Sequence, residues 1–208
     1  MALSEPMRVQ LIAAVLVAGL ISPAGAANVA KTYSYFPVGG STLDAIQTQL
    51  DTRGPEVEPT GRRHPGAVWM NFVADVDYRT SSKGCSIASA SLTVQAKIIL
   101  PRWRGPLPTD PALQLFWDTL SADIKRHEEA HVIIAKNHAR ALERSLLAVG
   151  GQWDCDDAEA KFEETTRQGL AKHYAAQTEF DCVERLNFDS RMERLLQHRR
   201  ERISKAQR

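Results

Sequence analysis

The 208-residue sequence predicts an α+β fold, in which a small antiparallel sheet packs on a long C-terminal pair of helices. Three observations predict it. Apolar and polar side chains alternate over residues 68–78 and 87–100, the period of half-buried strands. No proline or glycine interrupts residues 112–149, which indicates one long helix. Gly150-Gly151 then separates this helix from a second helical stretch that runs past Asp181, so the two should form an antiparallel hairpin.

The N-terminal part of the fold is predicted to be a short strand followed by a helix. Lys31–Val38 carries alternating aromatic residues, as a strand does. Ser41 is placed to cap a helix that runs to about Leu50, and Gly54-Pro55 ends it. The polar stretch from Pro55 to Gly66 is expected to be a surface loop.

The two alternating stretches are predicted to be one long antiparallel hairpin. Val68–Tyr78 and Ile87–Leu100 are its strands, and the residues from Thr80 to Gly84 are its turn. A linker from Pro101 to Pro108 should follow. Asp110-Pro111, an N-cap residue followed by proline at the first helical position, then starts the long helix.

The first 26 residues are typical of a secretory signal peptide. Leu11–Ile21 is apolar but too short for a stable membrane span, and Ser22-Pro23 breaks the run. Ala24-Gly25-Ala26 supplies a small-x-small cleavage pattern, so we expect cleavage after Ala26 and a periplasmic or secreted protein. An uncleaved N-terminal anchor is the alternative. No later stretch is apolar enough to span a membrane.

The charge of the chain is balanced overall and uneven locally. The formal net charge of +1 argues against nucleic acid as the main partner. Residues 184–208 carry eight Lys or Arg and four Asp or Glu, with few apolar residues. We therefore expect residues 186–208 to be a basic helix or tail with a solvated face, and a weak contact with an anionic surface is the second interpretation.

Three cysteines fit an exported protein with one disulfide and one free thiol. Cys155 and Cys182 bracket the second predicted helix, which would hold them about 40 Å apart, too far to bond. Cys85–Cys155 is therefore the predicted disulfide, and Cys85–Cys182 is the second choice.

Residues 127–131, His-Glu-Glu-Ala-His, form the pattern H-E-x-x-H inside the predicted long helix. His127 and His131 share one helix face, about 6 Å apart along the axis. Both imidazoles can then reach one Zn2+ ion, and Glu128 can take a proton from zinc-bound water. His138 lies about 10 Å beyond His131 along the helix, too far to share the ion. We therefore predict a zinc site with Glu128 as its general base.

A catalytic zinc site needs a third protein ligand and an open position. Counting back from the Gly150-Gly151 turn places residues near 174–178 opposite the two histidines. The inward polar residues of this window are His173, Gln177 and Asp181. His173 and Asp181 miss the expected position by similar amounts in opposite directions, so both stay open as the third ligand. A hydrogen-bonded polar layer without metal is the alternative to either.

The chain resembles the bacterial family of predicted secreted zinc-dependent proteases catalogued as domain of unknown function 922, in the zincin group. The resemblance covers about Tyr33 to Asp181. The matching elements are Gly40-Ser41-Thr42, Gly54-Pro55, Cys85, Leu100-Pro101-Arg102-Trp103, Trp117, the H-E-x-x-H pattern, Cys155-Asp156 and Phe180-Asp181, and Gln177 also fits.

The resemblance implies one zincin-like metalloprotease domain over residues 27–185, with a sheet part (27–108) and a helical hairpin (109–185). It also selects Asp181 as the third ligand, because the family carries a tyrosine-aspartate pair there. The chain departs from the family after this pair. Glu184, Leu186 and Asn187 stand where the family has threonine, histidine and glycine.

These patterns together predict an exported zinc-dependent hydrolase, most simply a peptidase acting on a peptide or protein substrate. The strand hairpin would offer an edge to an extended substrate. His173 and Tyr174 are candidates for stabilising the oxyanion. A catalytically inactive periplasmic binding or assembly module is the alternative that the altered residues after Asp181 favour. A membrane-surface factor that uses the basic C-terminus is a further one.

Overall fold

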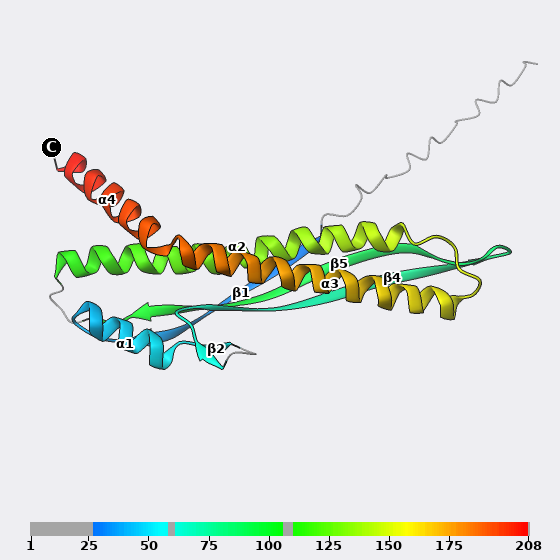
Figure 1. Ribbon diagram of the computed structural model, residues 1–208, viewed down its shortest axis with the longest axis horizontal. Helices are drawn as coiled ribbons and strands as arrows, with labels where there is room; N and C mark the ends of the chain where they lie inside the picture. Colours follow the sequence, from blue (N-terminus) through cyan, green and yellow to red (C-terminus); the bar gives the residue numbers. More distant parts are fainter. Residues whose placement is uncertain (1–26, 58–60, 106–109, 208) are drawn as a thin grey trace, which may run out of the picture.

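The computed structural model describes residues 27–57, 61–105 and 110–207. The predicted signal peptide (1–26) and the last part of the predicted linker (106–108) lie outside them. The chain folds into an elongated α+β molecule (Figure 1). Its elements in order are β1 (Asn28–Val38), α1 (Leu43–Arg53), β2 (Glu56–Val57), β3 (Arg62–Arg63), β4 (Ala67–Ser81), β5 (Gly84–Trp103), α2 (Pro111–Leu147), α3 (Cys155–Leu186) and α4 (Phe188–Ala206).

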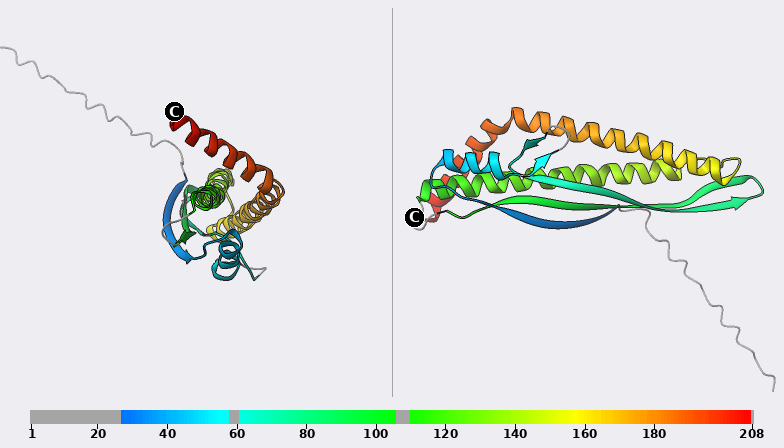
Figure 2. Two further views of the ribbon diagram at one scale, coloured as in Figure 1. Left: turned by 90° about the vertical axis from the view of Figure 1, so that its left-hand side faces the viewer. Right: turned by 90° about the horizontal axis from the view of Figure 1, so that it is seen from below.

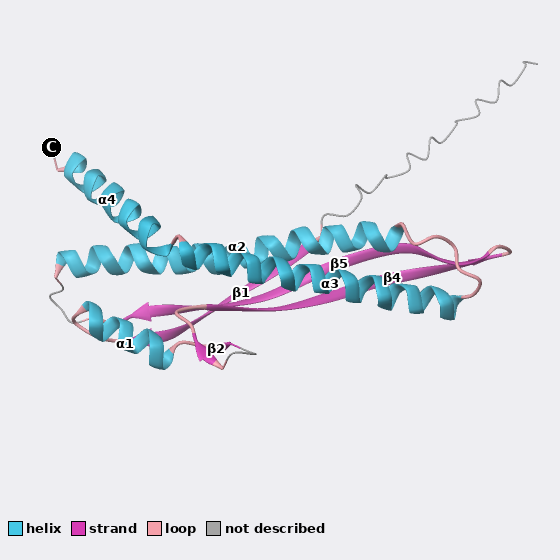
Figure 3. Ribbon diagram, viewed as in Figure 1, coloured by secondary structure: helices cyan, strands magenta, loops and turns pink. Residues whose placement is uncertain are grey.

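The main sheet has the strand order β1-β5-β4 (Figure 3). The predicted long hairpin is present, with β4 antiparallel to β5 from Ala67↔Ile99 to Ser81↔Gly84. Its turn is tighter than the predicted Thr80–Gly84, because Thr80, Ser81 and Gly84 belong to the ladder. The expectation of a purely antiparallel sheet was wrong, because β1 runs parallel to β5 from Asn28↔Thr93 to Val38↔Trp103. A parallel pair needs a long crossover between its strands. Here α1 and the hairpin strand β4 supply it.

Three smaller expectations also need correction. Helix α1 is capped by Thr42 and not by Ser41, because Oγ1 of Thr42 accepts the amide of Ala45. Part of the predicted loop at residues 55–66 pairs as the short ladder β2–β3. The predicted linker starts later than Pro101, because β5 continues to Trp103 beside the end of β1. Trp103 Nε1 also donates to the carbonyl oxygen of Gly40, which ties this end of the sheet to the start of α1.

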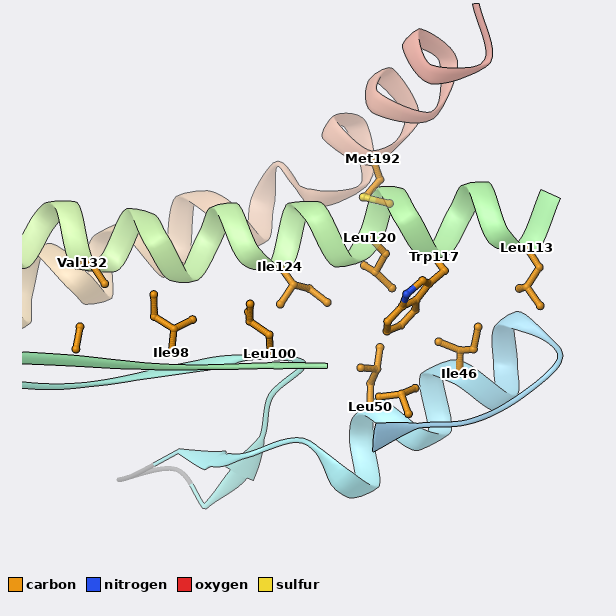
Figure 4. Packing of buried hydrophobic residues seen from close by; sticks show 12 residues of the cluster. Ile46, Leu50, Ile98, Leu100, Leu113, Trp117, Leu120, Ile124, Val132 and Met192 are labelled. Carbon is orange, nitrogen blue, oxygen red and sulfur yellow. The ribbon is translucent and has the colours of Figure 1, made fainter. Parts of the chain in front are cut away.

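Helix α2 covers one face of the sheet and carries the core. It starts where Asp110 Oδ1 accepts the amide of Ala112, as the N-cap pattern predicted. The inward alternation of β5 is confirmed, because Leu92, Val94, Ala96, Ile98 and Leu100 are all buried. Ala96, Ile98 and Leu100 meet the apolar face of α2, and Ile46 and Leu50 of α1 close this cluster at its end (Figure 4). Leu92 and Val94 pack in a second cluster, farther along α2.

Helices α2 and α3 run side by side along the sheet (Figure 2). They pack closely at Gly169, where an added Cβ would lie 2.9 Å from a methyl carbon of Leu142. The predicted disulfide is confirmed: Cys85 at the start of β5 bonds Cys155 at the start of α3. The backbones of Cys85 and Gln152 also exchange two hydrogen bonds. The hairpin loop is thereby fixed to the sheet, and Cys182 is a free, exposed thiol.

The basic C-terminal segment is helical. Helix α4 diverges from the axis of α3 after Asn187 and passes across α2 (Figure 1). Met192 is buried there in the same apolar cluster as Trp117 and Leu120 of α2. None of the helices in the described part of the chain is both long and apolar enough to cross a membrane.

Candidate metal centre

The H-E-x-x-H residues lie near the middle of α2, where the helix contacts both α3 and the sheet. His127 and His131 point to α3, as expected for residues four apart. Glu128, one position on from His127, points instead to the segment that enters β4. The two imidazoles and the carboxylate therefore leave α2 on different sides, yet Glu128 is close enough to interact electrostatically with both histidines.

The two histidines meet Asp181 of α3. Nε2 of His131 lies 3.0 Å from Oδ1 of Asp181, and Nε2 of His127 lies 3.2 Å from the same oxygen. The two Nε2 atoms are 3.1 Å apart. Within the described residues these three form the group of His, Cys, Asp and Glu side chains whose spacing suits a metal ion.

The triangle of these three atoms has the dimensions of a zinc site. Ligands about 2.0–2.1 Å from a tetrahedral zinc ion lie about 3.3 Å from one another. The three observed distances, 3.0, 3.1 and 3.2 Å, fall just below this value. One ion above the triangle can therefore reach all three atoms and keep a fourth position for water or substrate, so the donor set fits Zn2+.

The charges at the triangle favour an ionised Asp181. Burial alone would raise the pKa of its carboxyl group, but its hydrogen bonds with His127 and His131 outweigh burial and hold the pKa below its usual value. Burial lowers the pKa of His131, and the hydrogen bonds with Asp181 and Gln177 more than reverse this, so the pKa is raised. A metal ion at the triangle would displace the proton from Nε2 of His131, leaving an anionic carboxylate between two imidazoles.

Glu128 is the buried acid of the site, with 5% of its surface exposed. The segment that enters β4 passes so close that a Cβ on Gly66 would lie 2.8 Å from Oε1 of Glu128. Only glycine leaves room for the carboxylate at this point. Burial raises the pKa of Glu128 to about 7, although His127 and His131 pull it down. A carboxyl group with this pKa can accept a proton near neutral pH.

Gln177, which the sequence placed only among the inward polar residues, orients His131. Its Oε1 accepts a hydrogen bond from Nδ1 of His131, and its Nε2 donates to the carbonyl oxygen of the same residue, 3.1 Å away. A proton held on Nδ1 by Gln177 would leave Nε2 available to bind a metal ion at the triangle. The spacing of Gln177, Asp181 and Glu184, four and then three residues apart on α3, is the signal that could have grouped them.

His173 and Tyr174 lie apart from the triangle. His173 is buried, and its Nε2 lies 2.7 Å from Nε2 of Gln177, which donates to it. Burial, with His138 and His131 nearby, lowers the pKa of His173 to about 4, so the ring is neutral. Tyr174 is exposed, and its ring contacts His173. The structure brings neither residue to the two Nε2 atoms.

Two residues that the sequence did not place at the site also contact it. Phe180 stacks on the ring of His127, with centroids 5.1 Å apart, and meets His131 edge-on at 5.0 Å. Oε2 of Glu184 lies 3.5 Å from Nδ1 of His127. The carboxylate of Glu184 therefore lies next to the metal triangle.

Comparison with known proteins identifies a family. Neither the curated proteins nor the solved structures contain a match to this chain. A sequence family described as a bacterial protein of unknown function, DUF922, matches residues 33–189, which include α2, α3 and every member of the triangle. The chain therefore belongs to the bacterial DUF922 family.

Proposed function

We propose that the protein is an exported zinc-dependent hydrolase, most simply a peptidase. The observation that carries the proposal is the convergence of three ligand atoms, from His127, His131 and Asp181, beside the buried carboxylate of Glu128. The apolar N-terminal run and the Cys85–Cys155 disulfide support action outside the cytoplasm.

The residues of the site would have two different roles in hydrolysis, metal binding and proton transfer. His127, His131 and Asp181 would hold the ion. When bound, zinc polarises the scissile carbonyl and makes a water ligand more acidic. Glu128 would accept a proton from the attacking water and pass it to the leaving amine. Its burial beside Gly66 keeps its pKa near neutrality, and a cation at the triangle would favour the carboxylate form.

The sheet supports an extended peptide as substrate. In the order β1-β5-β4 the outer edge of β4 has no strand partner among the described residues. This strand begins at Ala67, next to the glycine that touches Glu128. A peptide that adds to the edge of β4 by backbone hydrogen bonds would therefore pass the general base at the start of the strand.

A binding or assembly module is the second candidate function. It is favoured by Glu184, which lies against His127 and stands where the resemblance leads us to expect a threonine. An altered outer residue could preserve the fold and the metal while removing catalysis. Hydrolytic activity of the zinc-loaded protein distinguishes the two candidates.

The first test removes the general base and leaves the ligands in place. Glu128→Gln keeps the shape of the side chain but cannot accept the proton, so we expect unchanged zinc content and a loss of casein hydrolysis of about 100-fold or more. Glu129→Gln is the matched control, because Glu129 is an adjacent carboxylate that bonds Tyr33 instead of facing the triangle. Hydrolysis by zinc-loaded Glu128→Gln at the wild-type rate would refute the assignment. A zinc-loaded wild type that cleaves no peptide would favour the binding module.

A further inference from the structure

The imidazole of each proposed histidine ligand has a partner on the side away from the metal triangle. Nδ1 of His131 donates to Gln177, as described above. Nδ1 of His127 faces Oε2 of Glu184 at 3.5 Å, the outer limit of a hydrogen bond. Such partners fix the tautomer and the ring orientation of a metal-binding histidine. Glu184 can do this for His127 only if its own carboxylate is held in place.

Two guanidinium groups hold that carboxylate. Arg126 of α2 binds Oε2 of Glu184 through Nη2, and Arg191 of α4 approaches the same oxygen to 3.3 Å. Arg191 also donates to the backbone carbonyl of Glu184 at 3.4 Å. The side chain of Glu184 keeps only 16% of its exposure. It is therefore confined between the arginines and His127.

Both arginines also bind the carboxylate of Asp123. Its side chain is 4% exposed and lies one helical turn before His127 on α2. Arg126 donates from Nε to Oδ1 at 2.9 Å. Arg191 binds in the two-pronged manner that suits a carboxylate, from Nε to Oδ1 at 3.0 Å and from Nη2 to Oδ2 at 3.1 Å. Two acids and two bases thus form a closed network that ends on the imidazole.

The network reaches beyond the family domain. The family match ends at residue 189, and Arg191 lies two residues later, in the first turns of α4. The next residue, Met192, is buried against α2 and holds this part of α4 in place (Figure 4). Glu184, inside the family domain, and Arg191, beyond it, therefore meet in one ion-pair network.

We propose that Arg191 is a positioning residue for the metal site: with Asp123 and Arg126 it fixes Glu184, and Glu184 fixes His127 with its Nε2 directed at the ion. The proposal rests on the proposed zinc site. It assigns the C-terminal helix α4 a part in metal binding. Removing such an outer partner typically lowers metal affinity about 10–100-fold.

The test compares two arginines of α4. Arg191→Met keeps an unbranched side chain and removes the guanidinium group. Arg194→Met is the control, because Arg194 is exposed on the same helix. Zinc affinity is measured by competition with a chromophoric chelator, and the fold is checked by circular dichroism. We expect Arg191→Met to bind zinc about 10–100-fold more weakly and Arg194→Met to match the wild type. Equal affinity in a folded Arg191→Met protein would overturn the proposal.

A second readout needs no metal and separates this proposal from the zinc site itself. In the metal-free protein, NMR detects the contact between the rings of His127 and Phe180, whose centroids lie 5.1 Å apart. The wild type should show this contact, and Glu184→Leu and Arg191→Met should weaken it, because the ring of His127 loses the carboxylate that holds its Nδ1 side. A contact of equal strength in a folded Arg191→Met protein would overturn the proposal even if zinc binds. A wild type without zinc affinity, in which the two substitutions weaken the contact as expected, would refute only the zinc site.

Discussion

At the scale of single residues, the sequence predicts the site residues within α2 better than the ligand that α3 supplies. His127, Glu128 and His131 are placed by helix periodicity alone, because four residues make about one turn. Asp181 depends on how two helices align. Counting from Gly150-Gly151 placed residue 174 opposite His131, whereas the structure places Gln177 and Asp181 there. Two backbone hydrogen bonds between Gln152 and Cys85 fix the loop between the helices to the sheet, and no local pattern encodes them.

The residue-scale prediction concerns the third ligand. Asp181→Ala should weaken zinc binding more than about 100-fold, beyond the loss typical of an outer partner, because the variant lacks one side of the triangle. His173→Ala should change the affinity less than about tenfold, because His173 contacts Gln177 and not the two Nε2 atoms. Competitive zinc titration of both folded variants measures this. The reverse order of affinities would make His173 the ligand.

At the scale of elements, strands and helices follow from the sequence, but their partners do not. The alternation in β4 and β5 predicts both strands and their inward faces, and the unbroken run of α2 predicts its length. The alternation in β1 also predicts a strand, but it does not predict whether that strand runs parallel or antiparallel to β5. A strand period is the same for parallel and antiparallel neighbours. The pairing is decided by the crossover and by the free edge that β4 leaves on β5.

The disulfide provides the element-scale prediction. Cys85–Cys155 closes a loop with a sequence separation of 70 residues and joins the first residues of β5 and α3. Replacing both cysteines by alanine should lower the free energy of unfolding by about 2–4 kcal/mol, mainly because the unfolded chain gains freedom. Guanidinium denaturation under oxidising conditions measures it.

Cys182→Ser is the control for this prediction, because Cys182 is exposed and unbonded. It should leave the unfolding midpoint unchanged. If the control loses as much stability as the double variant, or the double variant loses none, the disulfide does not have the stabilising role assigned here.

At the scale of the whole molecule, the metal triangle lies between two long helices that are fixed at both ends. The disulfide and the hairpin loop fix α3 to the sheet at one end. At the other end Arg191 and Met192 of α4 fix the end of α3 to α2. The basic charge of α4 suggested a solvated face, and the pattern gave no sign that Arg191 binds Asp123 on another helix. A partner so distant in the sequence is visible only after folding.

The zinc site is tested most simply by the zinc content of the purified mature protein, determined by elemental analysis beside His131→Ala after both are incubated with zinc and dialysed. We expect equimolar zinc in the wild type and almost none in the variant, because His131 supplies one of the three atoms of the triangle. A wild type without zinc, or equal zinc in both proteins, would contradict it.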